Sequence, residues 1–338
     1  MNWVHLKTSL IRLRGDLSVP SLLGTDDRNG WRDPRCTMDK VTAIGFIGLG
    51  AMGSPMSANL VRAGFQVTGF DLDARTCAVL AACGGTAAAS SAEAARGAEV
   101  LVLMVPTART AQAALFEDGA LDALPEGAVV VLMATCLPAE VAAIAERVQA
   151  SGRRFVDAPV SGGVAGARAG GLTIMAAAPK DDLAAVWPLF EALGTRLFVV
   201  GERPGQGAVA KAVNQLLCGV HIAAAAEAFS LAERLGLDLQ AILEIVSGSS
   251  AASWMIGDRG PRMLRPPGEI TSAVDIFCKD LGIVLDTGRE AKAALPLSAA
   301  AYQMFLAASS RGEGRLDDSQ VIRSWRIMGG GDGDPPAG

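Results

Sequence analysis

The chain has 338 residues, half of them hydrophobic, and a formal net charge of −5. It contains two histidines (His5 and His221) and one tyrosine (Tyr302), which excludes a zinc site built on a histidine cluster. The acidic balance and the lack of a basic stripe argue against nucleic acid as the main partner.

The same counts of histidine and tyrosine limit which catalytic groups the chain can use. Leu306 stands four residues after Tyr302, so the Tyr-x-x-x-Lys pair of short-chain dehydrogenases is absent. A Ser-His-Asp triad would have to use His5 or His221. The six cysteines form no C-x-x-C pair, which favours reduced thiols and a cytoplasmic location. No uninterrupted apolar run approaches the roughly 18 residues that cross a bilayer, so we expect no membrane partner.

The first residues differ from the rest of the chain in their sequence pattern. Residues 1–37 have little periodicity and lack the apolar region of a signal peptide. We expect a disordered extension or a mis-assigned start, with the folded part opening at Met38. The glycine-rich tail, 329–338, is also expected to be disordered.

From residue 41 to residue 201 the pattern alternates between strands and helices. β-branched and apolar runs predict strands at 41–48, 65–71, 99–105, 128–132, 153–160, 172–177 and 196–200. The intervening segments predict helices at 52–63, 73–82, 138–152 and 181–193. Strands separated by helices indicate an α/β fold with a doubly wound, parallel sheet.

After Gly201 no strand pattern recurs. One long helix is predicted over 205–235, and further helices near 238–248, 274–292, 296–310 and 317–327. We therefore predict a nucleotide-binding domain at 38–201 and an all-α domain at 202–328 for substrate binding and dimerisation. Its apolar faces exceed what a small domain can cover, so we expect a homodimer or homotetramer.

A glycine fingerprint follows the first predicted strand and opens the first predicted helix. Gly48, Gly50 and Gly53 stand at the conserved spacing of G-x-G-x-x-G, in the segment Gly48-Leu49-Gly50-Ala51-Met52-Gly53. The glycines permit a tight turn, close approach of a pyrophosphate and close helix packing, respectively. Asp71 ends the second strand, where an acid accepts hydrogen bonds from ribose hydroxyls and repels a 2′-phosphate. The pattern predicts a dinucleotide site that prefers NAD to NADP.

Four segments in order resemble the β-hydroxyacid dehydrogenase family. They are its cofactor signature GFIGLGAMGSPMSANLVRAGFQVTGFD (45–71), its substrate segment DAPVSGG (157–163), its catalytic segment GQGAVAKAVNQ (205–215) and its second-lysine segment FCKDL (277–281). The resemblance covers about 41–327. It implies a Rossmann-type domain followed by an all-α domain, as in 6-phosphogluconate dehydrogenase, and NAD-dependent oxidation of a small hydroxyacid without a metal.

The resemblance assigns roles residue by residue. It places Lys211 in the catalytic position, with Asn214 on the same helix face, either binding a substrate hydroxyl or orienting the lysine. Because histidine is nearly excluded by count, a lysine or a carboxylate must take the hydroxyl proton. Burial, the nicotinamide ring and Lys279 would lower the pKa of Lys211 from its usual value near 10.4.

The remaining site residues follow from the same comparison. Ser161, Gly162 and Gly163 are expected to hold the substrate carboxylate. Further cofactor contacts are expected from Val105, Pro106, Thr135 and Lys279. Relatives often have Ser-Thr where this chain has Ala134-Thr135. Two questions stay open: Asp280 pairs with Lys279 or with a helix terminus, and His221 is a core residue or a specificity contact.

Three function classes remain after this comparison. Segments such as NQLLCGVHIAAAAEA and SAVDIFCKDLGIVLDTGRE are similar to the family members that oxidise L-threonate to 2-dehydro-L-erythronate. Activity on 3-hydroxyisobutyrate or tartronate semialdehyde uses the same motifs and is the alternative. A non-catalytic NAD-binding protein is the third class, and the two lysines Lys211 and Lys279 argue against it.

Overall fold

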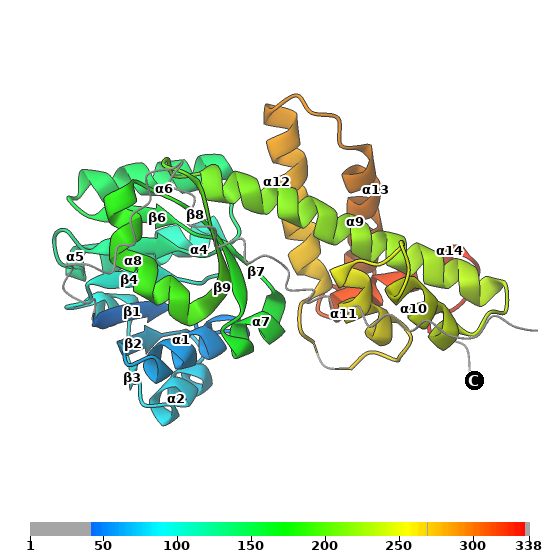
Figure 1. Ribbon diagram of the computed structural model, residues 1–338, viewed down its shortest axis with the longest axis horizontal. Coiled ribbons are helices and arrows are strands. Elements are labelled where there is room, and N and C mark those ends of the chain that lie inside the picture. The colour runs from blue at the N-terminus through cyan, green and yellow to red at the C-terminus, as the bar shows by residue number, and fades with distance from the viewer. Residues whose placement is uncertain (1–41, 269, 335–338) are drawn as a thin grey trace, which may run out of the picture. The chain divides into compact units, whose positions relative to one another are not determined.

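The computed structural model describes residues 42–268 and 270–334, and these residues belong to one compact unit (Figure 1). The predicted extension, 1–37, lies outside the described residues. Residues 329–334 are described and have contacts: Arg234 donates to the carbonyl of Gly329, and Asp334 pairs with Arg323. The expected disorder of the tail and the division into domains near residue 201 stay predictions.

The predicted parallel strands form the main part of a nine-stranded sheet with the order β3-β2-β1-β4-β5-β6-β8-β7, and β9 pairs with β8. The parallel set comprises β1 (Ala43–Ile47), β2 (Gln66–Phe70), β3 (Thr86–Ala87), β4 (Val100–Leu103), β5 (Val129–Leu132) and β6 (Arg154–Asp157). Strands β4 and β5 are buried along their whole length, which explains their continuous apolar sequences.

The last strands depart from a purely parallel arrangement. Strand β8 (Leu172–Ala177) runs antiparallel to β6 and to the short β7 (Val160–Ser161), while β9 (Gly194–Gly201) is parallel to β8. The sheet is therefore parallel-dominated and mixed. Apolar periodicity marks strands but carries no direction, so the reversal could not be inferred from it.

Helices cover both faces of the sheet. The helices of this half are α1 (Gly53–Arg62), α2 (Ala74–Ala82), α3 (Ser91–Ala95), α4 (Ala108–Gln112), η2 (Ala113–Glu117), α5 (Ala120–Ala123), α6 (Pro138–Ala150), α7 (Gly163–Ala169) and α8 (Lys180–Leu193). Alternate residues of β4 enter opposite cores: Val100 joins the cluster of Met56 and Phe190, and Leu101 joins that of Leu115 and Ile144. This is the doubly wound architecture that the sequence predicts.

The second half is helical. It contains α9 (Gln206–Arg234), α10 (Leu239–Ser247), α11 (Trp254–Met263), α12 (Val274–Glu290), α13 (Pro296–Ala308), η3 (Ser309–Glu313), η4 (Asp318–Val321) and α14 (Ile322–Met328). Helix α11 was not predicted, since Gly260 and Pro261 interrupt its pattern; Ser253 caps it by accepting from the amide of Ile256. The rings of Phe277 and Phe305 stack in the core, with centroids 5.1 Å apart.

Helix α9 links the two halves, running from the sheet into the helical part (Figure 1). By length and composition alone it is apolar enough to cross a membrane, with a mean hydropathy of 1.4 in its best window. Uninterrupted apolar runs alone had led us to expect no segment able to cross a bilayer, and this helix is an exception by that measure. However, 56% of that window is buried in the protein and Lys211 lies on the same helix, which is typical of a core helix.

Candidate active site

A cavity of about 560 Å³ lies where the carboxyl ends of the parallel strands face the helical half. It brings together most of the residues that the sequence singles out. They are Gly48, Gly50, Ala51, Met52, Gly53, Asp71, Val105, Pro106, Thr135, Ser161, Gly162, Gly163, Lys211 and Lys279. Two predicted residues do not line this cavity: Leu49, whose side chain is fully buried, and Asn214.

The three fingerprint glycines have different surroundings. Gly48 has a φ of +95°, and a Cβ there would collide with the carbonyl of Met104. A Cβ on Gly53 would collide with the carbonyl of Gly48. A Cβ on Gly50 would meet nothing and would project into open space beside the cavity. The loop thus leaves a cradle at Gly50, beside the N-terminus of α1, that fits a pyrophosphate.

Asp71 follows β2 at the same edge of the sheet. One carboxylate oxygen accepts from the amide of Leu49 at 2.7 Å, and the other accepts from the amide of Asp73 at 2.9 Å. The side chain is therefore tied to the glycine loop, and it lines the cavity. This placement fits an acceptor for ribose hydroxyls.

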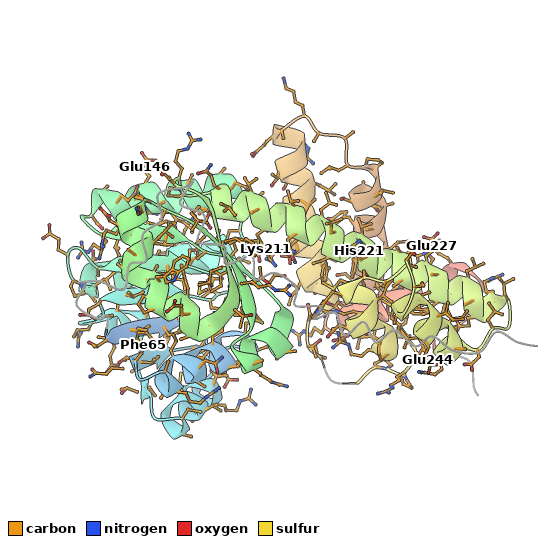
Figure 2. The ribbon with its side chains drawn as sticks, in the orientation of Figure 1. Phe65, Glu146, Lys211, His221, Glu227 and Glu244 are labelled. Carbon is orange, nitrogen blue, oxygen red and sulfur yellow. The ribbon has the colours of Figure 1, made fainter. Side chains whose placement is uncertain are left out.

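Lys211 lies on α9, on the part nearer the sheet (Figure 2). Its ammonium donates to Oε1 of Gln215 at 2.7 Å and lies 3.4 Å from Oδ1 of Asn214. The amide nitrogen of Gln215 in turn donates to Asp280. Sequence reasoning missed Gln215, although the i, i+4 spacing also places two residues on one helix face.

Burial lowers the pKa of Lys211 from its ordinary value, and the nearby Lys279 adds to the effect. Asp280 and Cys218 oppose it by favouring the charged form. The side chain of Lys211 is almost completely buried, and it reaches the cavity wall. A lowered pKa leaves more of this amine neutral at a given pH, and a neutral amine can accept a proton.

Lys279 joins the helical half to the sheet. It donates to the carbonyl of Thr135 at 3.0 Å and forms an ion pair with Asp280 at 2.8 Å. Of the two partners considered for Asp280, the structure therefore has the lysine. Through Asp280 and Gln215 the two lysines belong to one network of two hydrogen bonds and an ion pair.

The Ser161-Gly162-Gly163 segment runs from the end of β7 to the start of α7 and faces the same cavity. Gly162 and Gly163 have φ angles of +119° and +60°, so a side chain at either position would strain the backbone. The two glycines let the backbone amides approach a ligand closely.

Asp157 was not singled out by sequence reasoning, although it ends β6. Its Oδ2 accepts from the amides of Gly205 and Ala208 at 2.9 and 3.0 Å, which anchors the first turn of α9. Within the described residues, its Oδ1 has no hydrogen-bond partner. Burial raises the pKa of Asp157 to about 6, although the backbone amides lower it. The anchor fixes the start of the helix that carries Lys211.

His221 lies further along α9 than Lys211 (Figure 2) and is half-buried. It is not among the residues that line the cavity. The arrangement favours a structural position over a substrate contact.

Comparison with known proteins agrees with this geometry. A family profile described as the NAD binding domain of 6-phosphogluconate dehydrogenase matches residues 43–201. A second, described as NAD-binding of NADP-dependent 3-hydroxyisobutyrate dehydrogenase, matches residues 205–325. The chain is 43% identical to L-threonate dehydrogenase of Cupriavidus necator over 281 residues, covering 83% of this chain and 95% of the relative.

Two further similar proteins are named 3-hydroxyisobutyrate dehydrogenase. The chain is 34% identical to 3-hydroxyisobutyrate dehydrogenase of Pseudomonas aeruginosa, covering 85% of this chain and 99% of the relative. A crystal structure of 3-hydroxyisobutyrate dehydrogenase from Salmonella typhimurium superposes with a TM-score of 0.79 at 38% identity, covering 83% and 99% of the two chains. The chain therefore belongs to the β-hydroxyacid dehydrogenase family, related to 3-hydroxyisobutyrate dehydrogenase, and is an NAD-dependent hydroxyacid oxidoreductase.

Proposed function

We propose that the enzyme oxidises L-threonate to 2-dehydro-L-erythronate, with Lys211 as the general base. The observation that carries the proposal is the buried, hydrogen-bonded amine of Lys211 in the wall of the cavity that also contains the glycine fingerprint. Similarity to L-threonate dehydrogenases supports the substrate.

The cofactor would be held at the edge of the sheet. The N-terminal amides of α1 would bind the pyrophosphate at Gly50, and Asp71 would accept from the ribose hydroxyls. Val105, Pro106, Thr135 and Lys279 line the adjoining wall. When bound, NAD supplies the hydride acceptor. The negative charge of Asp71 supports NAD over NADP.

The substrate would lie between this wall and α9. Its carboxylate would accept from Ser161 and from the amides of Gly162 and Gly163. Its C2 hydroxyl would donate its proton to the neutral amine of Lys211, held in place by Gln215 and Asn214. In the reverse direction the ammonium returns the proton to the carbonyl oxygen.

The second candidate is oxidation of 3-hydroxyisobutyrate, favoured by the name of the Salmonella structure. A panel of hydroxyacids with purified enzyme and NAD, scored by NADH absorbance, separates the two. We expect the highest kcat/KM for L-threonate. A higher kcat/KM for 3-hydroxyisobutyrate, or for reduction of tartronate semialdehyde, would replace the proposed substrate.

We also propose a cytoplasmic homo-oligomer. Val209, Val213 and Leu217 recur every four residues along α9 and are 45%, 60% and 49% exposed. This apolar stripe supports burial against another copy of the chain. Light scattering should give a dimer or tetramer, and a monomer at every concentration would contradict this.

A further inference from the structure

Beyond the two lysines, the cavity has a second polar wall. Helix α11 contributes Trp254, Asp258 and Arg262 at intervals of four residues, and Met255 and Arg259 beside them. These five residues lie on one helix face, which borders the cavity. Nothing in the fingerprint, the substrate segment or the lysine pair accounts for the charges on this face.

Asp258 is the centre of this wall. Its Oδ2 accepts from Nη1 of Arg259 at 2.5 Å and from Nη2 of Arg262 at 2.9 Å. No described group donates to its Oδ1, and the side chain is 29% exposed. Two arginines thus hold the carboxylate in one orientation, and one oxygen keeps its lone pairs for a ligand.

Both arginines are already paired with other carboxylates. Arg259 forms a two-point ion pair with the buried Asp318, at 3.0 and 2.8 Å. Arg262 donates to Oγ1 of Thr271 at 2.6 Å and lies 3.3 Å from Asp317. The wall is therefore poorly suited to binding an anion through these guanidinium groups.

The net charge of this wall also disfavours binding of an anion. Asp258, Asp317 and Asp318 face two arginines, Arg259 and Arg262, which leaves one negative charge in excess. Asp275 also lines the cavity and adds another. An oriented carboxylate oxygen with surplus negative charge attracts hydroxyl donors and repels a second carboxylate.

Asp275 relates this wall to the reacting end. It precedes Lys279 by four residues on α12, which is about 6 Å along the helix axis at 1.5 Å per residue. Both residues line the cavity. Lys211 and Asp258 line this cavity too, so the reacting group and the α11 face border the same space.

We propose that Asp258 is a specificity-determining residue that binds a hydroxyl of the substrate beyond the reacting carbon, and so selects polyhydroxylated monocarboxylic acids. The inference rests on the proposed function, because it needs the reacting carbon at Lys211. For L-threonate the group bound by Asp258 is the C4 hydroxyl. Acids with a methyl group or a carboxylate at that carbon are disfavoured.

The test uses three acids of the same C2 and C3 configuration: L-threonate, its 4-deoxy analogue 2,3-dihydroxybutanoate, and the tartrate with a carboxylate at C4. We expect the wild type to prefer L-threonate over the 4-deoxy acid by about tenfold or more in kcat/KM. In Asp258→Leu, whose side chain makes no hydrogen bond, this ratio should fall below about threefold, while kcat/KM for the 4-deoxy acid stays within about threefold of the wild type. For the tartrate, kcat/KM should rise, because the repelling charge is gone.

The variant should lose kcat/KM for L-threonate and gain kcat/KM for the tartrate. Damage to the fold would lower both values, so the opposite changes separate substrate recognition from such damage. Asp286→Leu makes the same chemical change on an exposed part of α12 and should alter none of the three values. An equal loss for all three acids in Asp258→Leu, or an unchanged ratio, would overturn the proposal.

The wild-type enzyme tests the proposed function separately. If it leaves L-threonate unreacted but oxidises another acid with a distal hydroxyl, the proposed substrate fails. That acid and its deoxy analogue then decide the role of Asp258 through the same ratio. If it prefers an acid without a distal hydroxyl, both the substrate and the role of Asp258 are contradicted.

Discussion

The ammonium of Lys211 lies 2.7 Å from Oε1 of Gln215, one helical turn further along α9. The amide of Gln215 has a fixed orientation because its nitrogen donates to the buried Asp280. Gln215 is therefore positioned to keep the amine of Lys211 in one place, and Asn214 is the more distant partner at 3.4 Å.

Replacing Gln215 should damage turnover more than replacing Asn214. We expect Gln215→Leu to lower kcat about 10- to 100-fold, because a displaced base loses its alignment with the hydroxyl. The KM for NAD should change little. Steady-state kinetics of Gln215→Leu and Asn214→Leu give the comparison, and a larger loss of kcat in the Asn214 variant would reverse the assignment.

The two charged neighbours of Lys211 should shift its pH profile in opposite directions. Only the neutral amine accepts a proton, so oxidation rises as pH passes the pKa of Lys211. Asp280 raises this pKa and Lys279 lowers it. Asp280→Asn should therefore move the acid limb of kcat to lower pH, and Lys279→Gln should move it to higher pH. Shifts of the same sign in both variants would show that another group controls the limb.

The cofactor preference should depend on Asp71. Asp71→Asn keeps an oxygen for the amide of Leu49 but removes the charge that repels a 2′-phosphate. The ratio of kcat/KM for NAD to that for NADP should fall about tenfold or more, since one charge is removed from the ribose site. Asp73→Asn, two residues away and paired with Arg75, is the matched control. An unchanged ratio in Asp71→Asn would remove Asp71 from cofactor selection.

Asp157 should make stability depend on pH. Burial raises its pKa from 3.8 to about 6 in the folded protein. The protonated form is thus favoured by folding, and its contribution is complete below pH 3.8 and lost as pH rises through about 6. The loss corresponds to about 3 kcal/mol, at about 1.4 kcal/mol per pKa unit.

The free energy of unfolding of Asp157→Asn should therefore rise relative to that of the wild type as the pH is raised from low to neutral values. Its amide oxygen can still accept from Gly205 and Ala208, so the anchor of α9 is kept. Urea unfolding at about pH 4 and pH 7.5 measures the change. A constant difference between the two proteins would contradict the raised pKa.

Local patterns in the sequence identified much of the fold and of the site. The turn at Gly48, the acid at Asp71 and the long helix α9 each depend on neighbours close in sequence. The antiparallel direction of β8 and the helix α11 were missed, because periodicity has no direction and Gly260-Pro261 resembles a helix end.

Contacts between distant segments could not be inferred in this way. Asp157 accepts from Gly205, 48 residues later, at the start of α9, and Arg259 pairs with Asp318, 59 residues away. No spacing rule connects such partners. Gln215 is different, since its i+4 position was open to inspection, but Asn214, at i+3 on the same helix face, was chosen instead.

The central claim is that Lys211 takes the substrate proton, and Lys211→Ala tests it most directly. Rapid mixing of this variant with NAD and L-threonate measures the rate of NADH formation, and titration with NAD measures cofactor affinity. We predict a rate at least about 100-fold below that of the wild type, as expected for the loss of a general base, with NAD affinity retained. A near-normal rate of NADH formation would contradict the mechanism.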